Sequence, residues 1–497
     1  MKTNLEAERD MSLGSTGVRG GLVTLASQGI KILTQLVGLV VLSRLLSPAD
    51  FGLIAIITAV IAFGDLFRDF GLTYAAIQAD VLPRKEKTNL FWLNTAIGCL
   101  FAIILILAAP GLATVFEDER LTVVLVVTSA TFVLNGVQAQ FRVELVRHYK
   151  FTLLAIAESS AQFAGLAAAV ILALQGAGYW ALAFQQISIV AVLTIAIIAT
   201  ARWFPGLPSR NVSITRYLGY GKNLAFSQVL GYFASNADSM IIGIRFGAQS
   251  LGFYNRAFQL LMVPVNQLLA PLTNVVLPIL SRVQFEDAKF MRFLSAIHLA
   301  LTYLALVVFG LVVVAGEPIV DIALGLGWEQ TGNVLRILAV GGIFQTMNFV
   351  GYWAFLARGE TGSLLKYNLV TKTAVVISVI FGSQWGIQGI AWAYSASLAA
   401  TWPFLLVWLQ RLFKLSFKII GTTSIRVFSL FCLSVGAGFI GLDYFSSDIP
   451  LQSISVVVVI QLGVYFLSLL MPSIRSDMRE LLGFLRLVSH GKSIRAA

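Results

Sequence analysis

Residues 90–115 read LFWLNTAIGCLFAIILILAAPGLATV, an apolar run without a charged side chain. Roughly 20 such residues cross the hydrocarbon core of a bilayer as a helix. Arg84, Lys85 and Lys87 precede the run, and the acid-rich sequence EDER, residues 117–120, follows it. The stretch therefore predicts a membrane-spanning helix whose two ends meet different surroundings.

The rest of the chain resembles this stretch in composition. Of its residues, 58% are hydrophobic and 12% are charged, whereas an ordinary soluble domain has about 25% charged residues. Because lipid offers no hydrogen-bond partners, such runs have to form helices, and they are too continuous for the alternating strands of a membrane barrel. We therefore predict an all-α polytopic membrane protein of about 14 transmembrane helices. The predicted spans are residues 18–43, 51–72, 90–115, 121–141, 151–174, 179–201, 224–246, 251–280, 293–315, 334–356, 364–382, 387–409, 419–442 and 451–471.

The net charge of +11 is distributed by side of the membrane. Alternate loops and the two tails hold 26 of the 35 Lys and Arg residues, and the other loops hold only Arg44, Arg120 and Arg245. Positive loops stay in the cytoplasm, so we expect both termini to be cytoplasmic. We call the side of the protein on which these 26 basic residues lie the basic side. No nucleic-acid partner is expected, because this charge is a topology signal and forms no compact basic domain.

The sequence also resembles itself. Gly52 and Gly252 lie in similar sequences at an offset of 200, and Arg147 parallels Arg358 at an offset of 211. Six spans per copy is an even number, so the two copies have the same orientation and are parallel repeats. Transporters commonly bind substrate between such repeats. The predicted order is an N-tail (1–17), an N-lobe of spans 1–6 (18–201), a cytoplasmic linker (202–223), a C-lobe of spans 7–12 (224–409), two further helices (410–471) and an amphipathic cytoplasmic C-tail (472–497).

Several basic residues fall inside predicted spans, away from the membrane surface. A charge near the bilayer centre costs roughly 2.5–3.5 kcal/mol on insertion scales, so each one needs a partner or a wet cavity. One interpretation is a cationic cleft for an anionic substrate such as a diphosphate, and the other is a set of ion pairs that hold helices together. The candidate substrate-binding residues are Lys31, Arg256, Arg336 and Lys372.

Acidic residues inside the spans, Asp65 among them, are the candidate partners. Asp69, Glu158 and Asp238 are candidate counter-ions or coupling carboxylates. Arg68 and Arg426 lie near span ends, so we expect their side chains to extend to the membrane surface. The three histidines form no metal or catalytic pattern, so no catalytic residue, metal or cofactor is expected.

Several motifs resemble the polysaccharide transporter (Wzx-type) family of the multidrug/oligosaccharidyl-lipid/polysaccharide (MOP) exporter superfamily. In the first half these are LSRLLSPADFGL at residues 42–53 and DFGL at residues 69–72. In the second half they are NADSMIIG at residues 236–243, LGFYNRA at residues 251–257 and LPILSR at residues 277–282. The likeness covers nearly the whole chain and is nearest to exporters of the colanic-acid and succinoglycan type.

The resemblance implies a two-lobed, V-shaped bundle that works by alternating access through a cationic central cavity. It implies flipping of undecaprenyl-diphosphate-linked oligosaccharide repeat units to the periplasm for exopolysaccharide or lipopolysaccharide biosynthesis. Lys31 and Arg256 fall where members of the family carry cavity cations, although a Lys on span 1 departs from their all-Arg pattern. A polysaccharide polymerase or co-polymerase as partner and coupling to H⁺ or Na⁺ are further implications.

Two other functions deserve comparison with flipping. A multidrug or cation exporter of the same superfamily is the alternative, and it would favour an acidic, aromatic cavity. A membrane enzyme would need a sizeable outward loop for its catalytic groups. The longest predicted outward loop, between residues 315 and 334, is short and has no histidine, so we expect a transporter.

Overall fold

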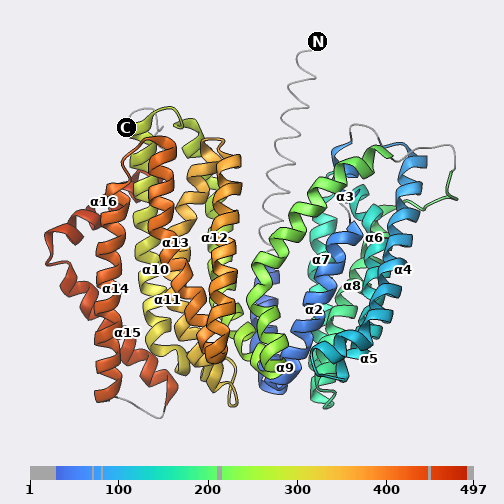
Figure 1. Cartoon of the computed structure of the whole chain (residues 1–497), viewed down its shortest axis with the longest axis horizontal. Coiled ribbons are helices and arrows are strands. Elements are labelled where there is room, and N and C mark those ends of the chain that lie inside the picture. Colours follow the sequence, from blue (N-terminus) through green and yellow to red (C-terminus); the bar gives the residue numbers. More distant parts are fainter. Residues whose placement is uncertain (1–28, 70–71, 80–81, 210–214, 446–448, 490–497) are drawn as a thin grey trace. The chain divides into compact units, whose positions relative to one another are not determined.

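The regular secondary structure of the described residues is entirely helical. This computed structural model describes residues 29–69, 72–79, 82–209, 215–445 and 449–489. Within those ranges the regular elements are helices, and no strand occurs (Figure 1). Backbone amides and carbonyls are thus paired inside each helix, as lipid requires. The predicted fold class is confirmed.

The chain divides into two compact units. The first comprises residues 1–236 and 243–252, and the second comprises residues 237–242 and 253–497. The lobe boundaries expected at residues 201 and 224 stay a prediction. The first unit holds a helix over residues 29–45, followed by α2 (Pro48–Asp69), α3 (Leu72–Gln78), α4 (Arg84–Val115), α5 (Arg120–Thr128), α6 (Ala130–Arg147), α7 (Phe151–Leu174) and α8 (Tyr179–Ala201).

The long element α9 (Thr215–Arg282) contributes residues to both units. Its regular conformation is interrupted at Gly247, whose φ of 75° and ψ of 179° suit glycine alone. This interruption falls between the predicted spans 224–246 and 251–280. The second unit continues with α10 (Asp287–Ala323), α11 (Glu329–Ala357), α12 (Thr361–Gly382), η1 (Ser383–Trp385), α13 (Gly386–Phe413), α14 (Lys418–Phe445), α15 (Pro450–Ser468) and α16 (Pro472–Ser489).

Ten segments among the described residues are long and apolar enough to cross a membrane. Two helices, α7 and α8, coincide with predicted spans residue for residue. One of the ten segments, Thr361–Phe413, contains both α12 and α13, and α9 is not among the ten. The number of crossings, about 14, therefore stays a prediction.

The fourth predicted span, residues 121–141, lies within one apolar segment, Arg120–Arg147. The helical hydrogen bonding of this segment is irregular at Ser129, between α5 and α6, although Ser129 keeps helical dihedral angles, with φ of −57° and ψ of −25°. The Thr128 hydroxyl donates to the Val124 carbonyl at 2.7 Å and the Ser129 hydroxyl donates to the Val126 carbonyl at 2.7 Å. Hydroxyls that bond back to the preceding turn compete with the helical ladder and can bend helices.

Helix packing follows the same order in the two units. In the first unit α4 packs extensively on α6, α6 on α8, and α7 on α8. In the second unit α10 packs on α11, α11 on α13, and α12 on α13. The positions of these helices along the chain correspond one to one, which agrees with the parallel repeats inferred from the sequence.

The start of α2 explains the first-half motif. Ser47 precedes the helix, and its hydroxyl accepts from the Asp50 backbone N–H at 3.3 Å. The Asp50 carboxylate accepts in return from the backbone N–H and hydroxyl of Ser47, at 2.9 and 2.6 Å. This is a capping box, with Pro48 at the first helical position, where its missing N–H costs nothing.

Two glycines at equivalent places in the repeats contact each other's motif, all within the first unit. A Cβ added to Gly52 would lie 1.5 Å from the carbonyl oxygen of Ala248. A Cβ added to Gly252 would lie 1.9 Å from the carbonyl oxygen of Pro48. We call this arrangement the reciprocal glycine contact. Only glycine allows backbones to approach so closely.

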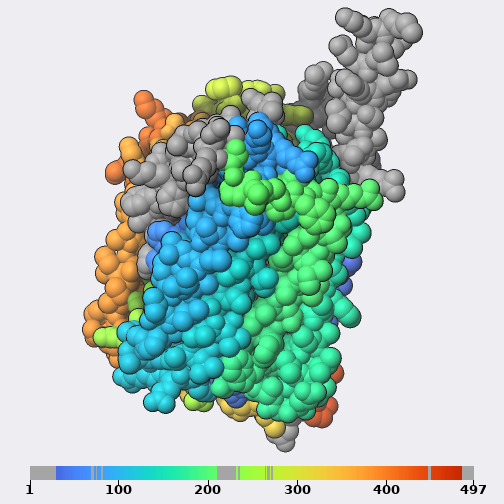
Figure 2. All heavy atoms as spheres, turned by 90° about the vertical axis from the view of Figure 1, so that its right-hand side faces the viewer, coloured from blue at the N-terminus to red at the C-terminus, as the bar shows by residue number. Residues whose placement is uncertain are grey.

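After α8 the chain turns back across α4. The Asn89 side chain donates to the Ser209 carbonyl and accepts from the Ser209 N–H, each at 2.8 Å. The Trp92 indole N–H donates to the Gly206 carbonyl at 2.9 Å. We call residues 202–209 the strap, and Figure 2 shows its green atoms against the blue beginning of α4.

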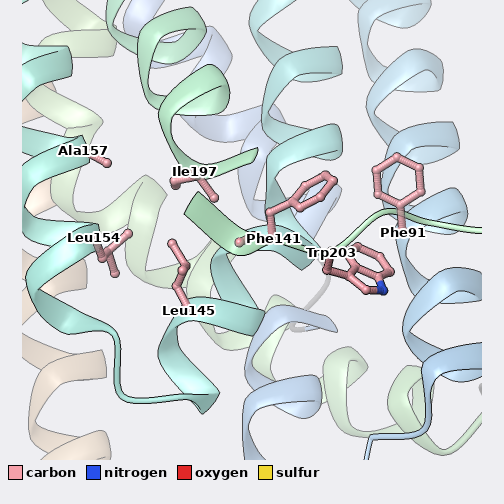
Figure 3. Close-up of a cluster of buried hydrophobic side chains, with 8 residues drawn as sticks. Phe91, Phe141, Leu145, Leu154, Ala157, Ile197 and Trp203 are labelled. Carbon is pink, nitrogen blue, oxygen red and sulfur yellow. The ribbon is translucent and has the colours of Figure 1, made fainter. Parts of the chain in front are cut away.

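Trp203 anchors the strap in a buried aromatic cluster on the basic side of the first unit (Figure 3). Its ring centroid lies 6.2 Å from that of Phe91 and 5.2 Å from that of Phe141, both edge to face, and Phe91 lies 5.8 Å from Phe141. Such pairs contribute about 0.5–1.5 kcal/mol each beyond their buried area. The cluster therefore fixes the ends of α4, α6 and α8 against the strap.

Candidate functional site

A charged cluster joins three helices of the first unit. Lys31, in the helix over residues 29–45, forms an ion pair with Glu158 of α7 through Nζ and Oε2. The other carboxylate oxygen of Glu158 accepts from Arg142 Nη2 of α6 at 2.6 Å. The side chains of Lys31 and Glu158 are 23% and 19% exposed, whereas that of Arg142 is 42% exposed. Two cations share one carboxylate, so the cluster keeps an excess positive charge.

The cluster brings two predicted site residues together. Both sequence interpretations of Lys31 remain consistent with it, because an ion pair to Glu158 satisfies the charge and the second cation still leaves the group attractive to an anion. Arg142 was placed in a loop by the sequence, and its part in the cluster was not anticipated. The roles of Lys31 and Glu158 in binding stay predictions.

In the second unit Arg336 is held by its neighbours. Its Nη1 pairs with Glu317 Oε1 at 2.7 Å, and its Nε donates to the Val313 carbonyl at 3.1 Å. The guanidinium carbon also lies 5.0 Å from the centroid of the Phe439 ring. Glu317 was assigned to an outward loop, yet it belongs to α10 and supplies the counter-ion.

The two remaining predicted cations also belong to the second unit. Arg256 Nη1 donates to the side-chain oxygen of Gln259, one turn further along α9, at 2.9 Å. Lys372 is partly buried in α12. Substrate binding by Arg256, Arg336 and Lys372 stays a prediction.

Asp238 is a buried carboxylate that two hydrogen bonds hold in place. Its Oδ2 accepts from the Tyr254 hydroxyl at 2.8 Å, and its Oδ1 accepts from the backbone N–H of Ser239 at 2.8 Å. The Ser239 hydroxyl donates to the side-chain oxygen of Asn255 at 3.1 Å. The motifs at residues 236–243 and 251–257 therefore contact each other through paired polar side chains.

Asp69, the third predicted acid, has a side chain outside the described part of the structure. The neighbouring carboxylate of Asp65 accepts from Arg68 Nε at 2.5 Å and from Asn135 Nδ2 at 3.2 Å. Arg68 is 9% exposed, so the expectation that it extends to the membrane surface is wrong. A carboxylate three residues earlier on the same helix face retains it instead.

Arg426 is retained in a similar way, by the C-terminal helix. Its Nη2 pairs with Asp477 Oδ1 of α16 at 3.0 Å, and the Tyr303 hydroxyl of α10 donates to Asp477 Oδ2 at 2.8 Å. Burial raises the pKa of Asp477, while the Tyr303 hydrogen bond and the Arg426 charge act to lower it. The predicted amphipathic C-tail thus has a carboxylate on its buried face, three residues after the buried Ile474. The position of Asp477 on the apolar face of the C-tail helix was the sequence signal that could have identified the contact with Arg426.

Among the described residues, no group of His, Cys, Asp and Glu side chains is arranged to hold a metal ion. His298, buried in α10, has its Nε2 2.8 Å from the Ser424 hydroxyl and its ring stacked on Trp402 at 5.2 Å. The His298 ring is therefore held by contacts with Ser424 and Trp402 inside the protein.

The sequence matches a known family and several named proteins. Residues 41–333, more than half of the chain, match the family described as polysaccharide biosynthesis protein. The chain is 26% identical over 408 residues to the lipopolysaccharide biosynthesis protein WzxC of Escherichia coli (strain K12), which covers 80% of this chain and 79% of that protein. It is 24% identical over 358 residues to the succinoglycan biosynthesis transport protein ExoT of Rhizobium meliloti (strain 1021), with 71% and 72% covered.

Two solved structures share the fold. The lipid II flippase MurJ in an inward closed conformation matches with a TM-score of 0.68 at 14% identity, over 90% of this chain and 99% of that one. An inward-facing multidrug resistance transporter of the MATE family matches with a TM-score of 0.56 at 13% identity, over 80% and 99%. The chain therefore shares the fold of these two solved proteins. The chain belongs to the polysaccharide biosynthesis protein family and is a multi-pass membrane transporter of the Wzx type.

Proposed function

We propose that the protein flips undecaprenyl-diphosphate-linked oligosaccharide repeat units from the cytoplasmic to the periplasmic leaflet of a bacterial inner membrane. The observation that carries the proposal is the family match over residues 41–333 in a chain with the fold of a lipid flippase. The repeat units would supply exopolysaccharide or lipopolysaccharide biosynthesis. Both termini are cytoplasmic in this proposal, because the basic side faces the cytoplasm.

The chemistry of the substrate agrees with the charged groups of the chain. A sugar diphosphate head is too polar to cross hydrocarbon unaided, so it needs a hydrated path with cations along it. Lys31 and Arg142 around Glu158 provide excess positive charge in the first unit. In the proposal the diphosphate is bound by four cations, Lys31, Arg256, Arg336 and Lys372. The protein opens the substrate path alternately to the two sides of the membrane.

Energy coupling and partners complete the proposal. H⁺ or Na⁺ drives the cycle, with Asp69, Glu158 and Asp238 as the candidate carboxylates. Asp238 is the most deeply buried of the described acids among them, and its hydroxyl partner Tyr254 carries no charge. A polysaccharide polymerase or co-polymerase receives the flipped units.

The test uses a strain that lacks the gene. It is complemented with the wild type, with Lys31→Ala plus Arg256→Ala, or with the conservative pair Lys31→Arg plus Arg256→Lys. We expect the alanine pair to lower surface polysaccharide by about tenfold or more, since a charge-assisted contact contributes about 1.5–3 kcal/mol. Lipid-linked oligosaccharide should accumulate, and the conservative pair should retain most activity at equal membrane levels.

The drug-exporter alternative makes the opposite prediction. If surface polysaccharide is unchanged in the deletion strain while its sensitivity to cationic drugs rises, the flippase proposal fails. If the alanine pair supports normal polysaccharide, the transport function stands and the assignment of these two cations fails.

A further inference from the structure

A cavity of about 570 Å³ opens on the basic side of the first unit, where α4 begins and α6 and α8 end. Its lining includes four cations, Arg84, Lys87, Arg147 and Arg202, and one carboxylate, Glu144. The strap forms one wall through Trp203. None of these residues belongs to the intramembrane charges discussed above.

Part of this charge is used within the protein. Lys87 Nζ pairs with Glu144 Oε2 at 2.7 Å and lies 4.4 Å from the centroid of the Trp203 ring. Arg147 Nη1 donates to the carbonyls of Ala76 and Ile77 at 2.9 and 3.2 Å, which fixes its guanidinium at the end of α3. Lys87 and Arg147, two of the four cations, therefore have structural partners within the protein.

The other two cations differ. Arg84 and Arg202 form no ion pair with any carboxylate in the described part of the chain, and both are exposed. Glu144 is already occupied by Lys87. The cavity therefore has two guanidinium groups available to an anion.

The second unit shows what a purely structural cation looks like at the equivalent place. Arg358, which parallels Arg147, pairs with Asp287 Oδ1 at 2.6 Å. Its guanidinium carbon lies 4.4 and 4.8 Å from the ring centroids of Phe290 and Phe413. There a carboxylate neutralises the cation and aromatic rings cover it. The cavity around Arg147 in the first unit has more cations than carboxylates. The repeated fold does not need this excess, because the second unit has a neutralised cation at the equivalent position.

The wall that the strap forms is held in place by packing and hydrogen bonds. Trp203 lies in the aromatic cluster of Figure 3, and the strap is tied to α4 through Asn89 and Trp92. Arg202 takes a left-handed conformation, with φ of 49° and ψ of 33°, at the end of α8. A site with fixed walls loses little entropy when it binds a ligand.

We propose that this cavity binds a phosphate group carried by a lipid at the membrane surface. Guanidinium groups match phosphate oxygens in pairs, and basic pockets at the cytoplasmic ends of transmembrane helices suit anionic headgroups. The phosphate can come from a bilayer phospholipid or from a polyprenyl diphosphate. Binding is measured without transport, so its outcome is independent of the proposed transport function.

The experiment uses the purified full-length chain in neutral detergent. The probes are dioleoyl phosphatidylglycerol, farnesyl diphosphate and, as a lipid without phosphate, dioleoylglycerol, with bound probe counted by native mass spectrometry. The cavity variant is Arg84→Gln plus Arg202→Asn, because asparagine tolerates the left-handed conformation. The matched control is Arg411→Gln plus Lys414→Asn, since Lys414 follows α13 in the same conformation, with φ of 55°.

We expect the cavity variant to bind at least one phosphate probe about tenfold more weakly than the wild type, because two charge-assisted contacts are lost. Loss of phosphatidylglycerol alone assigns a bilayer headgroup, and loss of farnesyl diphosphate alone assigns a lipid diphosphate. The control variant should bind as the wild type does, and both variants should keep the wild-type melting temperature. Equal losses in the two variants, or no loss in the cavity variant, would overturn the proposal. If the double variant melts early, the single substitution Arg84→Gln at the exposed start of α4 decides by the same measurement.

Discussion

At the scale of single residues, Glu158 binds two cations that come from different helices. Lys31 and Arg142 occupy its two oxygens, and Lys31 is mostly buried. Removing one partner of a buried pair leaves a charge without compensation, which costs more than the pair itself contributes. The coupling between Lys31 and Glu158 is therefore measurable even if the net contribution of the pair is small.

A double-mutant cycle measures this coupling. We expect Glu158→Gln to lower the apparent free energy of unfolding in detergent by about 1.5–3 kcal/mol, because both cations lose their carboxylate. Lys31→Met should cost less, since Glu158 keeps Arg142. The double substitution should be more stable than the sum predicts, with a coupling energy of about 0.5–3 kcal/mol.

A control residue calibrates this cycle. The exposed Glu119 precedes α5, and Glu119→Gln should change stability by no more than about 0.5 kcal/mol. Additive effects of Lys31→Met and Glu158→Gln would show that the ion pair does not stabilise the protein.

At the scale of elements, the reciprocal glycine contact sets the distance between the start of α2 and the middle of α9. The obstructing atoms are backbone carbonyl oxygens, at 1.5 and 1.9 Å from the added Cβ positions. Backbone cannot rotate away as a side chain can, so the helices would have to separate.

Substitution of either glycine tests this geometry. We expect Gly52→Ala and Gly252→Ala each to lower the apparent free energy of unfolding by about 3 kcal/mol, the upper end for overpacking. Gly111→Ala in α4 and Gly436→Ala in α14 are matched controls, because an added Cβ meets nothing within 4 Å there. These controls should be neutral or stabilising by up to about 1 kcal/mol. Melting in detergent and yield in the membrane are the measurements, and equal behaviour of all four variants would refute the close contact.

At the scale of the whole molecule, the asymmetry of basic residues predicts orientation in the membrane. The two ends of α10 provide a matched pair of exposed apolar positions. Phe285, just before the helix on the basic side, is 90% exposed, and Leu326, just after it, is 95% exposed. Both can carry a cysteine with little effect on packing.

Labelling of these positions checks the orientation. With Cys99 and Cys432 replaced by serine, Leu326→Cys should react with a membrane-impermeant maleimide in intact cells whose outer membrane is permeable. Phe285→Cys should react only after the inner membrane is opened, because positive loops stay in the cytoplasm. The reverse pattern would place the basic side in the periplasm.

Much of the fold could be predicted because lipid requires long apolar helices and charged loops mark their ends. Lys150 and the Gly176–Gly178 turn bound α7, and its ends were predicted to the residue. The local irregularity at Ser129, where α5 and α6 meet within one apolar segment, could not be predicted from the apolar run.

The candidate site was less predictable for a physical reason. A buried charge requires a partner, so Glu158 could be named from the sequence among several candidate acids, but it could not be assigned to Lys31 in particular. Asp238 is satisfied by the neutral hydroxyl of Tyr254, which gives no charge signal. Arg68 was expected at the surface although Asp65 stands three residues earlier on the same helix face. Nothing in the sequence shows that Asp477, in the C-terminal helix, reaches Arg426.

The reciprocal glycine contact also bears on the ancestry of the chain. Gly52 meets residue 248 and Gly252 meets residue 48, and each number of one pair differs by 200 from its counterpart in the other. In homodimers, such an exchange of identical contacts is the mark of a two-fold axis. A six-helix ancestor that paired with a second copy of itself would have made this contact twice, and gene fusion would have retained it. Neither descendant copy could then replace its glycine independently, because the obstructing carbonyl belongs to the other copy.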